Sequence, residues 1–145
     1  KLDFKKLHPA GSLGAQLRTV EDLMLTGEKI PFVSEKTKMN KALRVLSNKK
    51  LGILVVRNNK KMTSGIITDG EIRRNNQKNS NLQSLTADKL MTRNPICIDK
   101  NSLAAKALSL MNSKKITSLC VYEKKNKRKT IGVIHVHNIL SANIS

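Results

Sequence analysis

The sequence contains three histidines and two cysteines, the residue types that most often bind zinc. His135 and His137 are two residues apart, and no third ligand follows at a spacing typical of zinc. Cys97 and Cys120 lie inside apolar runs and form neither a CxxC motif nor a Cys-His pair. The sequence therefore predicts no metal, no cofactor and no disulfide framework, and we interpret both cysteines as core residues in a reducing cytoplasm.

A second pattern combines a hydroxyl with carboxylates in Thr68-Asp69-Gly70-Glu71. Thr68 or Asp69 is a good N-cap residue, and acidic side chains in the first turn favour a helix through its dipole. The pattern therefore predicts that a helix begins here. His135 and Asn138 have the same spacing at the corresponding place in the second half of the chain.

The charge of the chain invites a nucleic-acid hypothesis, because 28 Lys and Arg stand against 10 Asp and Glu, a net charge of +18. Lys and Arg that neutralise phosphates give affinity that does not depend on base sequence. Here they are spread over every segment, and the densest run, residues 123–129, separates two strand-like runs. We favour a solvated loop for that run and keep nucleic-acid binding as an alternative.

Length and hydropathy restrict the architecture. A chain of 145 residues with 39% hydrophobic residues supports one ordinary domain or two very small ones that share a core. No run of about 18 apolar residues occurs, and the charged residues 1–6 are followed by no apolar h-region. We therefore expect neither a membrane-spanning helix nor an export signal.

An internal repeat organises these elements. A Leu-Met pair ends an amphipathic stretch at Met24 and again at Met91, and a glycine begins a strand-like run at Gly65 and again at Gly132. The period is 67 residues for both landmarks. Because agreement over several elements is more specific than any single motif, we predict two units of one architecture.

Each repeat predicts the order helix, strand, helix, strand, strand, helix. The central helix is predicted from apolar residues that share a face: Met39, Ala42, Leu43 and Leu46, then Leu103, Ala107, Leu108 and Met111. A right-handed crossover between the first two strands gives a mixed sheet with helices on one face. One repeat cannot bury both faces of its sheet. The expected fold class is α/β, of the α+β type: two small three-stranded mixed sheets with helices, packed as a pseudo-two-fold pair.

These patterns resemble a tandem pair of CBS domains, a family named after cystathionine β-synthase. The resemblance rests on a Met-rich opening helix, a Pro-containing strand, an Ala-Leu helix, a buried strand, and Gly-apolar-apolar-Thr before a closing helix. It implies three parts: a linker from a missing domain at 1–19, a first CBS domain at 20–80 and a second at 81–145.

Three segments narrow the resemblance to the D-arabinose-5-phosphate isomerases, in which a CBS pair follows a sugar isomerase (SIS) domain. They are Asp3-Phe-Lys-Lys-Leu-His-Pro-Ala-Gly-Ser-Leu-Gly14, Gly65-Ile-Ile-Thr-Asp-Gly-Glu-Ile-Arg-Arg74 and Gly132-Val-Ile-His-Val-His-Asn-Ile-Leu140. The resemblance implies a parent enzyme with a SIS domain before Lys1, and a fragment without activity of its own. It also assigns His8 to proton transfer in the parent's active site, a role suited to a pKa near neutrality.

The resemblance further implies ligand-binding residues. Thr68 and Glu71 occupy the Thr-x-x-Asp positions of CBS domains, where the hydroxyl points to phosphate or ribose and the carboxylate accepts from ribose hydroxyls. His135 and Asn138 occupy the same positions in the second repeat. Backbone groups of two strand segments would line the cleft: Ile30, Phe32 and Val33, and Ile96, Cys97 and Ile98.

The function that this resemblance implies is regulatory binding of a nucleotide or nucleotide sugar, namely CMP-Kdo, AMP or ATP. The enzyme so regulated would interconvert arabinose 5-phosphate and ribulose 5-phosphate for Kdo and lipopolysaccharide synthesis. Expected partners are the chain's own SIS domain and further copies, as a homodimer of CBS pairs and a tetramer in the full-length enzyme. The alternative is a ligand-free clamp for the SIS domains, favoured by Glu71 and Asn138 in place of Asp.

Overall fold

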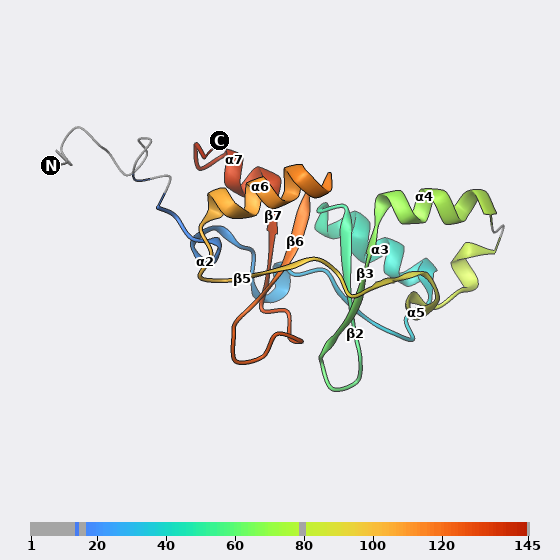
Figure 1. Ribbon diagram of the computed structural model, residues 1–145. Helices are drawn as coiled ribbons and strands as arrows, with labels where there is room; N and C mark the ends of the chain where they lie inside the picture. Colours follow the sequence, from blue (N-terminus) through green and yellow to red (C-terminus); the bar gives the residue numbers. More distant parts are fainter. Residues whose placement is uncertain (1–13, 15–16, 79–80, 145) are drawn as a thin grey trace, which may run out of the picture. The chain divides into compact units, whose positions relative to one another are not determined.

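Two small mixed sheets, each with helices on one face, make up the chain (Figure 1). The computed structural model describes residues 14, 17–78 and 81–144. Two compact units divide these residues. Unit 2 contains Gly27–Ile96 and Arg128–Thr130. Unit 1 contains the described residues before Gly27, the segment Cys97–Lys127, and the described residues from Ile131 onwards. The mixed α/β architecture predicted from the repeat is confirmed.

Unit 2 has a four-stranded sheet in the order β1-β2-β3-β4. Its strands are β1 (Phe32–Ser34), β2 (Ile53–Arg57), β3 (Thr63–Thr68) and β4 (Thr92–Arg93). Strands β1 and β2 are parallel, and the other two pairs are antiparallel. The helices are η1 (Gly27–Lys29), α3 (Met39–Lys49), α4 (Asp69–Lys78), η2 (Leu82–Ser84) and α5 (Ala87–Leu90). The sequence predicted three of these four strands, and β4 is the addition.

Unit 1 has a three-stranded sheet in the order β5-β6-β7. Its strands are β5 (Cys97–Asp99), β6 (Ser118–Tyr122) and β7 (Gly132–His135). Strands β5 and β6 are parallel, and β6 and β7 are antiparallel. The helices are α2 (Val20–Leu23), α6 (Ala104–Lys114) and α7 (Val136–Leu140). The order of elements along the chain therefore repeats as predicted.

Each core lies between the helices and one face of the sheet. In unit 2 the buried side chains of Met39 and Ala42 from α3 belong to the same cluster as Leu54 and Ile67 from the sheet. The corresponding prediction for α6 is wrong at Leu103. Because the helix begins only at Ala104, Leu103 is the N-cap residue with extended backbone, and its side chain is 44% exposed.

The opening segment of each repeat packs in the unit that the other repeat builds. Helix α5 and strand β4 are the first elements of the second repeat. Even so, β4 pairs with β3 of the first repeat, and Ala87 and Leu90 of α5 are buried in the core of unit 2. In unit 1, Val20 of α2 is buried in the core, and Leu25 exchanges two backbone hydrogen bonds with Val133 of β7, at 2.8 and 3.0 Å. The repeats thus exchange corresponding segments.

Two glycines allow this exchange. A Cβ atom on Gly65 would lie 2.5 Å from the backbone oxygen of Thr92, and one on Gly132 would overlap the sulfur of Met24. No real side chain tolerates such a separation without movement of the neighbouring segment. Gly65, the third residue of β3, and Gly132, the first residue of β7, are therefore sites of close backbone approach.

Candidate functional site

The candidate site in unit 2 lies where β3 ends and α4 begins. Thr68 caps α4, and Glu71 is the third residue of that helix. The Thr68 N–H donates to Glu71 Oε1 at 2.9 Å, the Thr68 hydroxyl donates to the same oxygen at 3.2 Å, and the Glu71 N–H donates to Thr68 Oγ1 at 3.4 Å. This reciprocal arrangement is a capping box. The structure therefore brings the two predicted ligand-binding side chains into direct contact.

The surroundings of this pair include residues that the sequence did not single out. The hydroxyl of Thr92 donates to the second carboxylate oxygen, Oε2, of Glu71. Gly52, with a positive φ of 68°, accepts a hydrogen bond from the Asp69 N–H at 3.2 Å. A carboxylate offers about four acceptor positions, so Glu71 keeps the capacity to accept from a ligand hydroxyl. Thr92 was missed because it lies in the opening segment of the second repeat.

The corresponding place in unit 1 has the same geometry with different side chains. Asn138 Oδ1 accepts from the His135 N–H at 2.8 Å, and His135 Nδ1 accepts from the His137 N–H at 3.1 Å. The two imidazole rings are stacked with centroids 4.8 Å apart. Burial, and then the charge of His137, hold the pKa of His135 below its ordinary value of 6.5. Among the described residues, no group of three or more His, Cys, Asp or Glu side chains could hold a metal ion.

This cap should make the stability of unit 1 sensitive to acid. His135 accepts at Nδ1 only when neutral, and its folded-state pKa is depressed, so the unfolded chain binds the proton more readily. Stability is therefore complete above pH 6.5 and falls as the pH decreases from 6.5 through the lower folded-state pKa. Urea denaturation between pH 7.5 and pH 5 should show this loss in the native chain and a smaller one in His135→Thr, which keeps an N-cap oxygen.

His137→Gln is the control for that measurement, because it removes only the lesser cause of the pKa shift. It should retain most of the pH dependence. An equal pH dependence in the native chain and in His135→Thr would contradict the assignment of the effect to His135.

The first predicted strand segment is largely engaged within unit 2. Ile30 and Val33 are buried, and Val33 belongs to the core cluster. The Phe32 N–H donates to the Ile30 carbonyl at 2.9 Å, and the guanidinium of Arg57 lies 3.8 Å from the centroid of the Phe32 ring. This cation–π contact fixes the half-buried ring at the start of β1. The role of these residues as a ligand lining stays a prediction.

The second predicted segment is divided between exposed and buried positions. Ile96 is 38% exposed and belongs to unit 2, whereas Cys97 and Ile98 belong to β5 of unit 1. Ile98 is buried in the core, and Cys97 is half-buried. His8, the predicted catalytic residue of the parent enzyme, lies outside the described residues.

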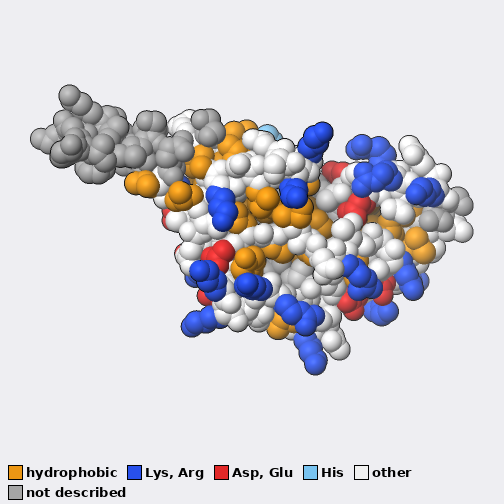
Figure 2. All heavy atoms as spheres, viewed as in Figure 1, with side chains coloured by type: hydrophobic (Ala, Val, Ile, Leu, Met, Phe, Trp, Pro, Cys, Tyr) orange, Lys and Arg blue, Asp and Glu red, His pale blue; other side chains and the backbone are white. Residues whose placement is uncertain are grey.

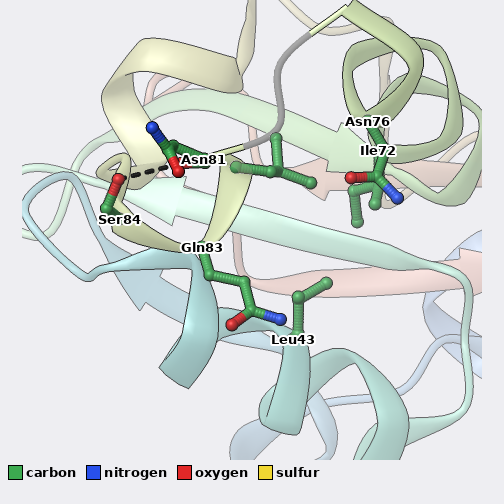
Figure 3. A pocket seen from close by; sticks show the side chains of 7 residues that line it. Leu43, Ile72, Asn76, Asn81, Gln83 and Ser84 are labelled. Atoms are coloured by element: carbon green, nitrogen blue, oxygen red, sulfur yellow. Dashed lines mark hydrogen bonds between the residues drawn. The ribbon is translucent and has the colours of Figure 1, made fainter.

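A cavity of about 310 Å³ lies elsewhere in unit 2, among α3, α4 and η2 (Figure 3). Its lining consists of Leu43, Ile72, Asn76, Asn81, Leu82, Gln83 and Ser84. The Ser84 hydroxyl donates to the Asn81 carbonyl at 2.8 Å at one end of it. None of the predicted ligand-binding residues lines this cavity, so we do not take it as the candidate site.

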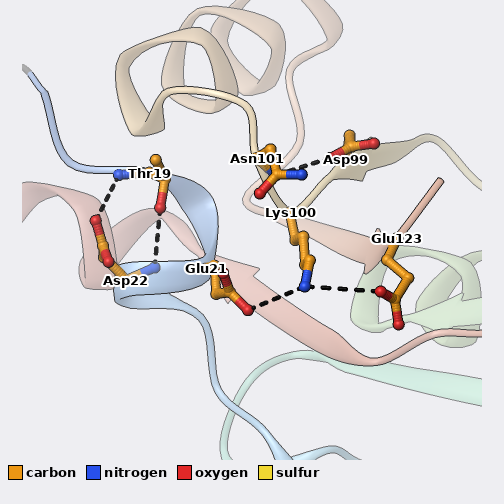
Figure 4. Close-up of polar contacts among 7 residues, drawn as sticks. All are labelled: Thr19, Glu21, Asp22, Asp99, Lys100, Asn101 and Glu123. Carbon is orange, nitrogen blue, oxygen red and sulfur yellow. Dashed lines mark hydrogen bonds and ion pairs between the residues drawn. The ribbon is translucent and has the colours of Figure 1, made fainter.

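A third capping box, in unit 1, gives a matched comparison for Thr68 (Figure 4). The Thr19 N–H donates to Asp22 at 2.9 Å, and the Asp22 N–H donates to Thr19 at 3.3 Å. The Thr19 backbone contact lowers the pKa of Asp22. Nearby, Lys100 pairs with Glu21 at 3.3 Å and Glu123 at 3.6 Å. Thr19 therefore reproduces the capping chemistry of Thr68 outside the predicted site.

Basic residues are spread along the sequence rather than concentrated in one segment. Figure 2 shows Lys and Arg side chains distributed over the face in view, with Asp and Glu between them. The loop that follows β6 carries Lys124, Lys125, Lys127 and Lys129 in exposed positions, as predicted. Among the described residues, no helix combines the length and apolar character needed to cross a membrane.

The repeated order of strands and helices, together with the Thr-x-x-acid cap at the end of β3, defines a class of protein. The chain belongs to the CBS domain family, whose model matches residues 20–77 and 87–145. Curated relatives of known name include arabinose 5-phosphate isomerase KdsD of Escherichia coli and of Yersinia pestis, each 36% identical over 143 residues. The uncharacterized protein RP505 of Rickettsia prowazekii is 37% identical over 143 residues.

The match covers nearly all of this chain but less than half of the length of each relative. It covers 98% of this chain for the two KdsD proteins and 99% for RP505, but only 43% of each relative. The chain thus corresponds to less than half of the length of the proteins it resembles.

Solved structures share the fold of this chain. CBSX2 in complex with AMP gives a TM-score of 0.74 at 23% identity and covers 87% of this chain and 96% of that one. An uncharacterized conserved protein from Pyrococcus horikoshii gives a TM-score of 0.74 at 22% identity, with coverage of 88% and 93%. At this identity the likeness concerns the fold alone.

Proposed function

We propose that this chain is the ligand-sensing CBS pair of a sugar-phosphate isomerase and binds a nucleotide or nucleotide sugar at the Thr68–Glu71 pair. The observation that carries the proposal is the position of this pair, since a hydroxyl and a carboxylate meet at the N-terminus of the ten-residue helix α4. The similarity to KdsD supports the isomerase as the regulated enzyme. The AMP bound to CBSX2 supports a nucleotide as the ligand class.

The chemistry of the pair fits a ribose better than a bare phosphate. Glu71 and the neighbouring Asp69 are anionic, and they accept hydrogen bonds from vicinal hydroxyls but repel a phosphate placed between them. The dipole of α4 attracts an anion on the axis of the helix. The exposed Arg73 and Arg74 lie one turn further along and can compensate the charge of a phosphate. A ligand with both a ribose and a phosphate satisfies both sets of groups.

Regulation requires that the ligand bind differently to active and inactive arrangements of the enzyme. We infer that CMP-Kdo acts as a feedback inhibitor of arabinose 5-phosphate isomerisation, with AMP and ATP as the competing candidates. In this proposal the catalytic chemistry belongs to the SIS domain of the parent protein, where His8 transfers a proton.

Calorimetric titration with CMP-Kdo, CMP, AMP and ATP tests the proposal. At least one of the four should bind saturably, and Thr68→Ala should weaken that binding at least about tenfold, since it removes a hydroxyl and loosens Glu71. Thr19→Ala is the matched control: it removes the equivalent cap in unit 1, at a similar cost of about 1 kcal/mol, and should leave the affinity unchanged. No binding of any of the four ligands would contradict the proposal.

A second function, assembly of the enzyme, is favoured by exposed leucines on unit 1. Leu103 at the start of α6 is 44% exposed, and Leu140 at the end of α7 is 49% exposed. Apolar side chains left exposed in this way are available to pack against another copy of the chain. Sedimentation of the chain should then show a dimer that Leu140→Glu dissociates. A monomer at all concentrations would exclude this second function for the chain alone.

A further inference from the structure

The two cysteines of the chain are brought together by strand pairing. Strands β5 and β6 are parallel, and Cys97 and Cys120 are direct partners in their register. Ile98 on β5 and Leu119 and Val121 on β6 point into the helical core of unit 1. Because side chains alternate along a strand, both cysteines lie on the other face of the sheet, one beside the other.

The two thiols contact each other and differ in access to solvent. The Cys120 thiol donates a hydrogen bond to the sulfur of Cys97, which lowers the pKa of Cys97 in spite of its partial burial. Cys97 is half-buried, and Cys120 is 1% exposed. A reagent in solution therefore reaches Cys97 first, and the hydrogen bond from Cys120 favours the thiolate form of that residue.

We propose that Cys97 and Cys120 form a reversible redox pair that closes to an intrachain disulfide when a peroxide oxidises the protein. The Cys97 thiolate attacks one oxygen of hydrogen peroxide and the O–O bond breaks, which gives a sulfenic acid on Cys97 and, after protonation of the leaving hydroxide, one water. The Cys120 sulfur then attacks the Cys97 sulfur. The S–O bond breaks, the S–S bond forms, and the hydroxyl leaves with the Cys120 proton as a second water. The dithiol loses two electrons, and the peroxide gains them.

The geometry of the sheet permits this bond and makes it easy to reduce. Neighbouring strands lie about 4.8 Å apart, which is inside the range of Cα separations that a disulfide bridges. Direct partners on parallel strands hold their Cβ atoms somewhat further apart than an unstrained disulfide prefers, so the strands must adjust slightly as the bond closes. Strained disulfides have oxidising potentials, and a thiol reductant should therefore reopen this one.

Mass spectrometry of the purified chain after treatment with hydrogen peroxide tests the proposal without any substitution. The expected product is a monomer in which both cysteines resist alkylation after denaturation and a cross-linked peptide pair containing Cys97 and Cys120 has lost two hydrogen atoms. Peptide mapping separates this product from oxidation of the five methionines. Dithiothreitol should restore both thiols.

The variant Cys120→Ala tests the order of events. It should halt the reaction at a sulfenic acid on Cys97 that dimedone traps, whereas Cys97→Ala should react far more slowly, since Cys120 is buried. Three outcomes would overturn the proposal: disulfide-linked dimers of the native chain, accumulation of sulfinic acid on Cys97 with Cys120 still alkylatable, or no change at peroxide concentrations that oxidise a free thiol.

Discussion

Gly65→Ala should lower the free energy of unfolding of the chain by about 3 kcal/mol, the upper part of the range for overpacking a close contact. The new Cβ would lie 2.5 Å from the backbone oxygen of Thr92 and 3.0 Å from the Met91 side chain. A backbone oxygen held in a strand pair cannot move aside as the end of a flexible side chain can. The substitution should therefore separate β4 from β3 and remove α5 from the core of unit 2. Urea denaturation followed by circular dichroism measures the loss.

Gly70→Ala is the matched control for Gly65. Its Cβ would meet only the end of the Arg74 side chain, at 3.2 Å, and alanine is the better helix former in α4. The control should be as stable as the native chain or slightly more stable. If Gly65→Ala and Gly70→Ala unfolded at the same urea concentration, the close approach of β4 to β3 would be wrong.

Leu119→Ala should be about as damaging, with a loss of about 3 kcal/mol. Leu119 has no exposed surface and lies on β6, facing the helices of unit 1. Truncation removes apolar contacts and leaves a cavity that the strands on either side cannot close. The neighbouring residue gives a local readout, because Cys120 is buried and reacts with a thiol reagent only after unit 1 opens. Faster labelling of Cys120 should accompany the loss of stability.

Leu17→Ala provides the comparison for Leu119, since the same side chain is truncated where it is 61% exposed. Its effect on the free energy of unfolding should stay below about 0.5 kcal/mol. Equal effects of the two truncations would contradict the assignment of β6 to the centre of unit 1.

The elements of the fold could be predicted from the sequence because their signals are local. Met39 and Ala42 recur at helical spacing and are buried on α3. Gly132 begins its expected strand, whereas the strand expected to begin at Gly65 begins two residues earlier, at Thr63. The partners of the elements could not be predicted in this way. Nothing in the hydropathy of residues 87–93 indicates that they pack with the first repeat, because the two repeats present similar surfaces to these segments. The error at Leu103 has a local cause, since periodicity does not locate the first turn of a helix to within one residue.

The contacts of the candidate site also fall into two groups, those that follow from local spacing and those that depend on the assembled fold. The contact of Thr68 with Glu71 follows from their spacing of three residues at a helix start, which is why the cap could be predicted. The Thr92 hydroxyl on Glu71 depends on the exchanged segment, and the Cys97–Cys120 contact depends on the register of two parallel strands. The register between two strands whose paired residues are 23 positions apart is a property of the assembled sheet. The local pattern around each cysteine therefore indicates two separate core residues and not a pair.

The exchange of opening segments also sets an order of events during synthesis on the ribosome. Unit 2 is almost contiguous, since Gly27–Ile96 contains its four strands and both opening elements of the second repeat. It can thus acquire its sheet and helices soon after these residues leave the exit tunnel. Unit 1 combines α2 with strands that follow unit 2 in the sequence, so this helix waits for β7 while the whole of Gly27–Ile96 is translated. The nascent protein must keep the apolar side chains of Val20 and Leu23 without their core partners for that time.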